Sequence, residues 1–156
     1  MGQSPVSALP TLCLPANGAF RRHAVSEDIA RVERRIRASF AKQGLMQTLG
    51  ATLGDVSPGQ VEIFLAPKRE ISQQHGFVHA GAVSAIADTA AGYAALSLMP
   101  PDRGVLTTEF KINLLAPATG ECLVARGRVV KAGRTLTLAH PKCSPEPTGS
   151  CGSSPC

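Results

Sequence analysis

The sequence predicts an α+β protein in which an antiparallel β-sheet packs against one long helix. Three observations support this class. An apolar stretch of helical length covers residues 80–99, strand-like segments lie on both sides of it, and short turns join neighbouring strands. The chain has 156 residues, of which 44% are hydrophobic and 17% charged, which suffices for one domain with one core.

The N-terminal part predicts a flexible arm followed by a helix. Residues 1–20 contain few charges and several Pro and Ser residues, which is typical of a loose arm. Ser26 is followed by two acids, a pattern typical of a helix start. Gly44 is expected to end this helix. Apolar residues recur between them at helical spacing: Ile29, Val32, Ile36 and Phe40.

Strands are predicted before and after the apolar helix. Residues 45–56 and 59–66 alternate weakly and are separated by Ser57-Pro58-Gly59, which predicts two strands joined by a turn. Pro100 ends the long helix. Three further strands are expected after it, at residues 105–115, at residues 121–131 and from residue 135.

The loop before the long helix and one acid within the helix are the candidate site. The first turn of a helix has free backbone N–H groups, which suit a developing negative charge. Asp88 follows about two turns later among apolar and small residues, where a buried carboxylate is costly without partners or a function. An oxyanion site beside an acid is the minimum equipment for acyl transfer or hydrolysis.

Composition and charge exclude several classes of function. Aromatic residues make up 4% of the chain and Trp is absent, which argues against a nucleic-acid stacking surface. The net charge of +5 favours a solvated basic helix face over nucleic-acid binding, and it would attract an anionic substrate. Residues 80–99 contain Asp88, so we expect no membrane span. Residues 1–20 lack the charged region of a signal peptide, so we expect a cytoplasmic protein.

Cysteine and histidine positions predict neither disulfides nor a metal site. The chain has five Cys, and an odd number without an export signal argues against a disulfide framework. Their spacing fits no paired zinc motif. His75 and His79 lie four residues apart, but no third ligand accompanies them at a useful spacing. We therefore expect no metal and no other cofactor.

Four motifs together resemble one protein family. They are Gln-x-x-Gly-x-x-His-x-Gly at residues 73–81, Ala-Asp-Thr-Ala-Ala-Gly at 87–92, Thr-Thr-Glu-Phe-Lys-Ile-Asn at 107–113 and Pro-Ala-x-Gly at 117–120. Over roughly residues 45–139 the chain resembles the PaaI-type hotdog-fold thioesterases. The resemblance implies an antiparallel sheet wrapped around one long helix, assembly as a homodimer or homotetramer, and metal-free hydrolysis of acyl-CoA thioesters.

The resemblance also assigns catalytic roles. It implies that Asp88 is the general base or nucleophile, acting on a thioester held mainly by the neighbouring subunit. The residue that orients the water or carbonyl corresponds to Gln73, and the amide that polarises the carbonyl corresponds to Ala80. Thr107 corresponds to the Ser or Thr that assists in some members. From the residues alone, Gln73 could equally fix its loop, and Thr107 could be an ordinary strand residue.

Two further positions of the motif are assigned to substrate binding. His79 corresponds to the family's motif His, which usually supports the loop, and Gly81 of the same motif is expected to bind the substrate with it. The family usually has His-Gly-Gly, whereas this chain has His79-Ala80-Gly81. Ala80 keeps its N–H donor, but its Cβ narrows the space beside the carbonyl. This difference bears on rate or acyl preference more than on the class of reaction.

The resemblance ends near residue 140. Residues 141–156 contain four Pro, three Cys and four Ser, whereas family members continue the preceding strand and add a closing strand inside the sheet. We therefore expect that residues 21–140 form the hotdog domain, that Pro141 interrupts the last strand, that the closing strand is missing, and that residues 141–156 form a disordered tail. We hypothesise that a single-base shift near the His140 codon replaced the C-terminus, which resequencing of the DNA would test.

Two other functions are compatible with the sequence. Hotdog hydratases and dehydratases use an Asp/His pair at short spacing near the helix start. Here His79 precedes Asp88 by nine residues, and the surrounding motif fits the thioesterases better. The second alternative is a truncated hotdog protein that binds acyl-CoA and is catalytically weak or inactive.

Overall fold

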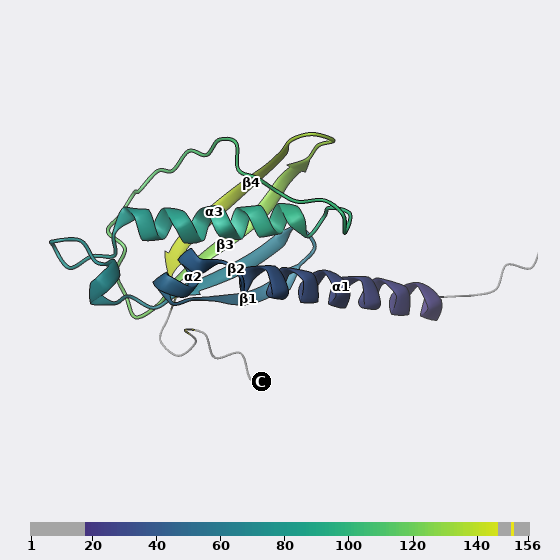
Figure 1. The fold of residues 1–156 in the computed structure, drawn as a ribbon, viewed down its shortest axis with the longest axis horizontal. Coiled ribbons are helices and arrows are strands. Elements are labelled where there is room, and N and C mark those ends of the chain that lie inside the picture. Colours follow the sequence, from purple (N-terminus) through teal and green to yellow (C-terminus); the bar gives the residue numbers. More distant parts are fainter. Residues whose placement is uncertain (1–17, 147–150, 152–156) are drawn as a thin grey trace, which may run out of the picture.

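The computed structural model describes residues 18–146 and residue 151. The predicted arm at residues 1–17 and the rest of the predicted tail lie outside the described residues. The helices and strands labelled in Figure 1 are α1 (Gly18–Phe40), α2 (Gly44–Leu49), β1 (Ala51–Ser57), β2 (Gln60–Leu65), α3 (Ala80–Leu96), β3 (Leu123–Ala132) and β4 (Thr137–Pro145). A 3₁₀ turn (Arg69–Ile71) lies between β2 and α3.

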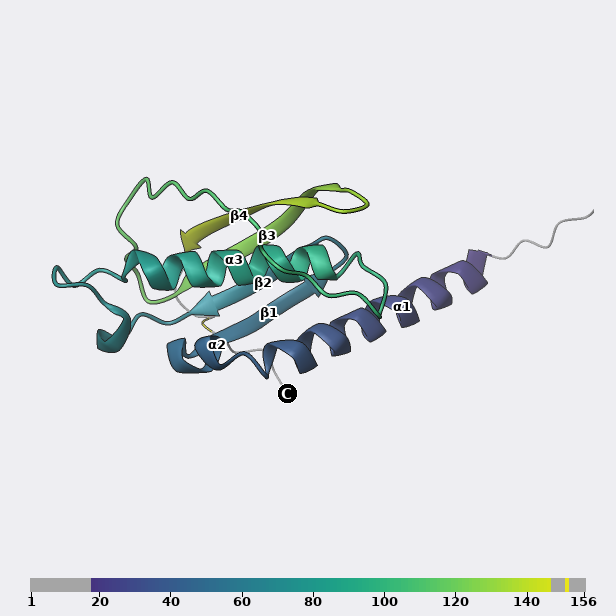
Figure 2. The ribbon, with the colours of Figure 1, turned by 45° about the horizontal axis from the view of Figure 1, so that its top comes forward.

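The predicted α+β class is confirmed. The strands of the described chain form one antiparallel sheet in the order β1-β2-β3-β4. Helix α3 lies along one face of this sheet, whereas α1 extends past its edge (Figures 1 and 2). No helix within residues 18–146 is long and apolar enough to cross a membrane.

The core lies between α3 and the inner face of the sheet. Alternate strand residues supply one side of it, and one stripe of the helix supplies the other. Gly127 of β3 permits the close approach, because a Cβ at this position would lie 2.3 Å from the carbonyl carbon and oxygen of Ala90 in α3. The buried residues that meet here are Val61, Ile63, Leu65, Leu123, Ala125, Ile86, Ala90, Tyr93 and Ala94.

Helix boundaries in the N-terminal half differ from the prediction. Ser26 does not start a helix, because α1 begins at Gly18 and no helix-breaking residue separates the two. Gly44 does not end α1, which stops at Phe40, and it begins α2 instead. The first half of the predicted strand at residues 45–56 is this short helix, because Met46 and Leu49 are buried at helical spacing. Gly50 ends the helix with φ of 72°, and β1 starts directly after it.

The predicted strand at residues 105–115 does not form. This segment is irregular and runs past α3 (Figure 1), and it pairs with no strand in the described part of the chain. A strand pattern is not realised without a neighbouring edge that satisfies its backbone N–H and C=O groups. Its large apolar side chains are therefore exposed: Leu106 (91%), Phe110 (61%), Leu114 (54%) and Leu115 (93%).

The predicted interruption at Pro141 is also wrong, because β4 continues to Pro145. The N–H of Glu146 donates to the carbonyl of Cys122 at 2.9 Å, which identifies one hydrogen-bonded pair of the β3–β4 ladder. Since such pairs alternate along antiparallel strands, Pro141 and Pro145 occupy positions whose backbone faces the free edge. Proline therefore costs no hydrogen bond there. The boundary of the domain at residue 140 stays a prediction.

The prediction against disulfides is wrong for one pair. Cys122, directly before β3, is bonded to Cys151, with 5.4 Å between their Cα atoms. An odd number of cysteines excludes complete pairing but not a single bridge, and this Cα separation lies in the range that a disulfide requires. Cys143, on β4, is a free thiol.

Candidate active site

The N-terminus of α3 is capped by His79. Its backbone is extended, with φ of −62° and ψ of 138°, and its Nδ1 accepts a hydrogen bond of 2.8 Å from the N–H of Gly81. The carbonyl of His79 accepts from the N–H groups of Ala82 and Val83. The exposed Ala80 N–H has no acceptor within the described part of the chain. This amide is therefore available to a ligand.

The loop before the helix is closed by its own residues. The N–H of Gln73 donates to the carbonyl of Phe77 at 2.8 Å, and Gly76 adopts φ of 84° at the turn. The side-chain oxygen of Gln73 accepts from the N–H of His75. In this structure Gln73 thus fixes its loop, which is one of the two roles considered for it. Its other role, orienting the water or carbonyl, stays a prediction.

Two backbone hydrogen bonds attach this loop to the rest of the protein. Val78 donates to the carbonyl of Ala118 at 3.2 Å, and His79 donates to the carbonyl of Ile71 at 2.8 Å. Ala118 was not among the candidate residues, although it lies in the Pro-Ala-x-Gly motif that contributed to the family resemblance. The Gly of this motif, Gly120, adopts φ of 106°, which explains why glycine occupies that position.

Asp88 is partly exposed rather than buried, which corrects the expectation from its apolar neighbours. Ser84, Asp88 and Ala91 lie on one helical face, and all three are partly exposed because this face points away from the sheet. Thr107, from the irregular segment, donates a hydrogen bond of 2.7 Å from its hydroxyl to Oδ1 of Asp88. The carboxylate therefore has a polar partner and access to solvent.

The structure thus arranges the candidate residues in two groups. Asp88 and Thr107 form one group, whereas the residues around the start of α3 form the other: Gln73, His79, Ala80 and Gly81. Eight residues of helix separate Ala80 from Asp88, which corresponds to about 12 Å along the axis. An attacking group and a carbonyl-polarising amide must both lie within about 3 Å of the reacting atoms. One copy of the chain cannot bring these two groups to the same carbonyl.

No metal-binding cluster is evident near His75 and His79. Among the side chains that the structure describes, at residues 28–146 and 151, no three His, Cys, Asp or Glu converge in a way that could hold a metal ion. The chemistry that the described residues offer is therefore a carboxylate, a hydroxyl and backbone amides.

Comparisons with known proteins decide the family. A model of the thioesterase superfamily matches residues 75–140. A thioesterase family protein from Silicibacter pomeroyi has a solved structure that is 50% identical, with a TM-score of 0.70, over 72% of this chain and 82% of that chain. The chain belongs to the thioesterase superfamily. It is therefore a hotdog-fold hydrolase that acts on thioester bonds.

More distant relatives agree with this assignment. A Halobacterium salinarum protein that carries an esterase name is 33% identical over 62% of this chain and 67% of that protein. The 1,4-dihydroxy-2-naphthoyl-CoA hydrolase of Listeria monocytogenes is 25% identical over 66% of this chain and 84% of that enzyme. The PaaI protein of Escherichia coli shares the fold, with a TM-score of 0.67 and 18% identity over 76% of this chain and 83% of that one. At this identity the likeness to the PaaI protein shows a shared fold.

The family match ends where the composition changes. Its last residue is His140, directly before the segment rich in Pro, Cys and Ser. The structure continues β4 beyond this point, to Pro145. The fold therefore uses the first residues of the unusual C-terminus even though they lie outside the family match.

Proposed function

We propose that this thioesterase hydrolyses acyl-CoA thioesters to the free acid and CoA. The CoA hydrolase among its relatives supports this substrate class. The net charge of +5 also suits a substrate that carries several phosphate groups. A thioester carbonyl has little resonance stabilisation, so a positioned carboxylate and a backbone donor can suffice for its hydrolysis.

The proposed site is assembled from two copies of the chain. The observation that carries this proposal is the separation of Asp88 from the N-terminus of the same helix, about 12 Å along its axis. A second copy that places its own helix start opposite Asp88 would bring a carboxylate and a free amide to one carbonyl. In this arrangement Asp88 activates water or attacks the thioester itself.

The other candidate residues support these two groups. The Ala80 N–H of the second copy would polarise the carbonyl, and His79 and Gly81 would shape the turn that presents it. Thr107 would hold the Asp88 carboxylate through the hydrogen bond described above. Gln73 would orient the water or carbonyl with its side-chain N–H groups, since its oxygen is engaged within the loop.

A homodimer or homotetramer would also bury apolar surface that one copy leaves exposed. Residues 105–115 retain a strand pattern but have no strand beside them in the described chain. Leu106, Phe110 and Leu114 are each more than half exposed. Exposed apolar side chains grouped in one segment are typical of an interaction surface. We propose that a second copy covers this segment.

The replacement Asp88→Asn tests the catalytic proposal. We expect it to lower kcat for hydrolysis of acyl-CoA by roughly tenfold or more, because an amide cannot serve as a base. Free CoA is measured with a thiol reagent on short, medium and aryl substrates. Asp102→Asn is the matched control, since Asp102 is an exposed acid beside Arg103. If Asp88→Asn retains full turnover with an unchanged oligomeric state, Asp88 is not the catalytic acid.

One observation favours a second function. The sheet ends at β4 without a closing strand among the described residues, and the segment that carries Thr107 is irregular. A protein with a loosely held site could bind acyl-CoA and hydrolyse it slowly or not at all. Calorimetry measures binding of acyl-CoA, and the thiol reagent measures release of CoA. If the chain binds acyl-CoA but releases no CoA in a reaction that requires Asp88, the binding protein is favoured over the enzyme.

A further inference from the structure

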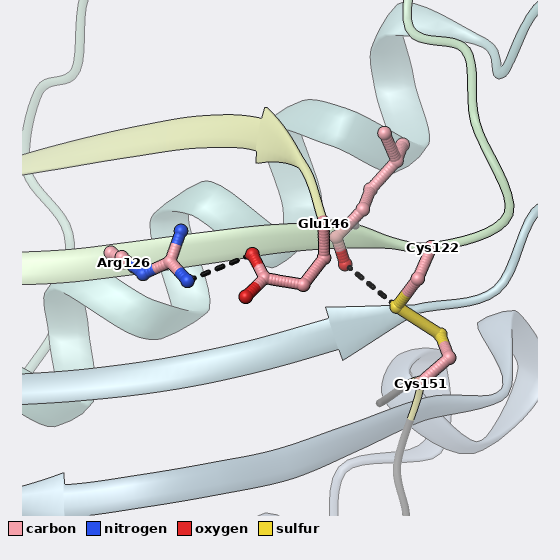
Figure 3. The surroundings of a disulfide bond; sticks show 5 residues. Cys122, Arg126, Glu146 and Cys151 are labelled. Atoms are coloured by element: carbon pink, nitrogen blue, oxygen red, sulfur yellow. Dashed lines mark hydrogen bonds and ion pairs between the residues drawn. A yellow bond between two sulfur atoms is a disulfide. The ribbon is translucent and has the colours of Figure 1, made fainter. Parts of the chain in front are cut away.

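The residues that follow β4 are attached to β3 by three interactions of different chemistry. The N–H of Glu146 donates to the carbonyl of Cys122 at 2.9 Å, the carboxylate of Glu146 meets Arg126 at 2.8 Å, and Cys151 is bonded to Cys122. Figure 3 shows the two side-chain links side by side. We call the four residues Cys122, Arg126, Glu146 and Cys151 the tail clamp. We infer that the tail clamp is redox-controlled and that reduction of its disulfide frees Cys151 from Cys122 and destabilises the fold.

The two sulfur atoms of the bridge differ in accessibility. Cys122 is 4% exposed, whereas Cys151 is exposed. A thiolate from a dithiol reductant therefore attacks Sγ of Cys151, and the Cys122 sulfur leaves and takes up a proton. The second thiolate of the reductant then attacks the mixed disulfide and frees the Cys151 thiol. Two electrons pass to the protein, and the reductant becomes a disulfide.

The reduced Cys122 thiol would have an acceptor close by. Its sulfur lies 3.7 Å from the carbonyl oxygen of Leu123, which is within reach of a weak S–H hydrogen bond. Opening the bridge therefore leaves no unsatisfied charge in the buried site. Two links to Glu146 then remain: its backbone hydrogen bond to Cys122 and its ion pair with Arg126. The side chains of this ion pair are 42% and 24% exposed, and such pairs contribute little on their own.

The remaining free thiol of the described chain is a poor competitor for the bridge. Burial raises the pKa of Cys143 to about 11, so its thiolate is scarce at neutral pH. Its sulfur also lies against the carbonyl of Val83 on the inner side of β4, at 3.9 Å. Exchange at the tail clamp thus depends on an added reductant rather than on Cys143.

The tail clamp is also close in sequence to the support of the candidate site. Cys122 lies four residues after Ala118, whose carbonyl holds Val78 directly before the helix cap at His79. The bridge fixes one end of the segment that contains Ala118. Reduction should therefore loosen the turn that presents the Ala80 amide. This second effect rests on the proposed function, whereas the effect on stability does not.

The experiment compares the oxidised full-length chain with the same chain in dithiothreitol. Cys13 and Cys156 are replaced by Ser so that they cannot exchange, and peptide mapping verifies the Cys122–Cys151 link. We expect reduction to lower the Tm by about 5–15 °C. Cys151→Ser should show the reduced Tm under both conditions, and Cys143→Ser should behave as the parent chain. An equal Tm with and without reductant, or absence of the mapped link after air oxidation, would overturn the inference.

A second measurement distinguishes the effect of reduction on stability from its effect on catalysis. Loss of thioester absorbance, which does not depend on a thiol reagent, gives kcat and KM for the oxidised and reduced chains at a temperature well below both Tm values. We expect kcat to fall several-fold on reduction. A lower Tm with unchanged kcat would contradict the link to the active site while supporting the clamp. Absence of hydrolysis in both forms would contradict the proposed function and leave the Tm result valid.

Discussion

Two segments of this protein have similar strand patterns and different structures. Residues 59–66 were predicted as a strand, and β2 forms there between β1 and β3. Residues 105–115 were predicted in the same way from Thr, Phe, Ile and Leu, and they remain irregular. Val61, Ile63 and Leu65 of β2 are almost fully buried, whereas Leu106 and Leu115 are more than 90% exposed.

The difference shows that neighbours, and not pattern alone, decide whether a strand forms. The backbone of β2 is hydrogen-bonded on both sides, and its inner side chains contact α3. Residues 105–115 lie beside neither edge strand within the described sheet. A strand preference of at most about 1 kcal/mol per residue cannot replace these contacts. The following predictions test this contrast between the sheet packed on α3 and the irregular segment at residues 105–115.

Replacement of a glycine by alanine should strongly destabilise the protein in the sheet and have little effect in the irregular segment. Gly127→Ala, in β3, would place a Cβ 2.3 Å from backbone atoms of Ala90, so helix and sheet must separate. We expect the free energy of unfolding to fall by about 3 kcal/mol or more. Gly104→Ala, at the start of the irregular segment, meets no atom within 4 Å and should have little effect. Urea unfolding measures both, and equal losses would contradict the contrast.

The cap of α3 should contribute less than the packing of its centre. His79→Ala removes the acceptor for the Gly81 N–H, and we expect a loss of about 1 kcal/mol in the free energy of unfolding. His79→Asn retains an acceptor at nearly the same position and should lose only a few tenths of this. Thermal unfolding provides the comparison. If Asn is as destabilising as Ala, the Nδ1 hydrogen bond is not what stabilises the helix start.

A side-chain hydrogen bond joins the two regions at the proposed site. Thr107→Val removes the hydroxyl that donates to Asp88 at 2.7 Å, and we expect kcat to fall about fivefold, or about 1 kcal/mol. The fall is modest because both residues are accessible to water. Thr108→Val, one residue along the same segment, is the control. Equal kcat values for the two variants would show that Thr107 does not position the carboxylate.

The smallest expected effect concerns the thiol of Cys143, which lies on β4. Burial raises the pKa of Cys143 from 9.0 to about 11, so the unfolded chain loses this proton at lower pH than the folded chain. The stabilisation is therefore complete below about pH 9 and is lost as the pH rises through 11. Alkylation of the Cys143 peptide at pH 8, followed by mass spectrometry, should be roughly a hundredfold slower in the folded chain than in urea. Equal rates would show that Cys143 is not protected.

The sequence predicts most of the layer that contacts α3. The long helix, the turn at Pro58 and the strands around it follow from apolar periodicity and turn residues, which are local signals. Errors occur where local signals compete or where partners are distant. Met46 and Leu49 fit a helix better than a strand, and Ser26 is a capping residue type within a longer helix. The length of β4 depends on which of its backbone groups face β3, because proline is tolerated only where they face away. This property of strand pairing cannot be seen in the periodicity of apolar residues.

The positions of two candidate residues along the helix could be predicted from the sequence, but the geometry around them could not. The motif placed Ala80 at the helix start and Asp88 two turns later, and the structure has both at those positions. The exposure of Asp88 and its hydrogen bond with Thr107 depend on the path of a segment that the pattern predicted as a strand. The bridge between Cys122 and Cys151 joins residues 29 positions apart, and residue spacing gives no information on such a pairing.

The two prolines of β4 have a consequence for how this protein behaves at high concentration. Pro141 and Pro145 remove N–H donors from the outer edge of the sheet, so another chain cannot add a fully bonded strand there. Uncontrolled edge-to-edge polymerisation is thereby disfavoured on that side, although the strand is long and has no neighbour in the described chain. An unusual C-terminal sequence can thus make an open sheet safer from aggregation than its topology alone would suggest.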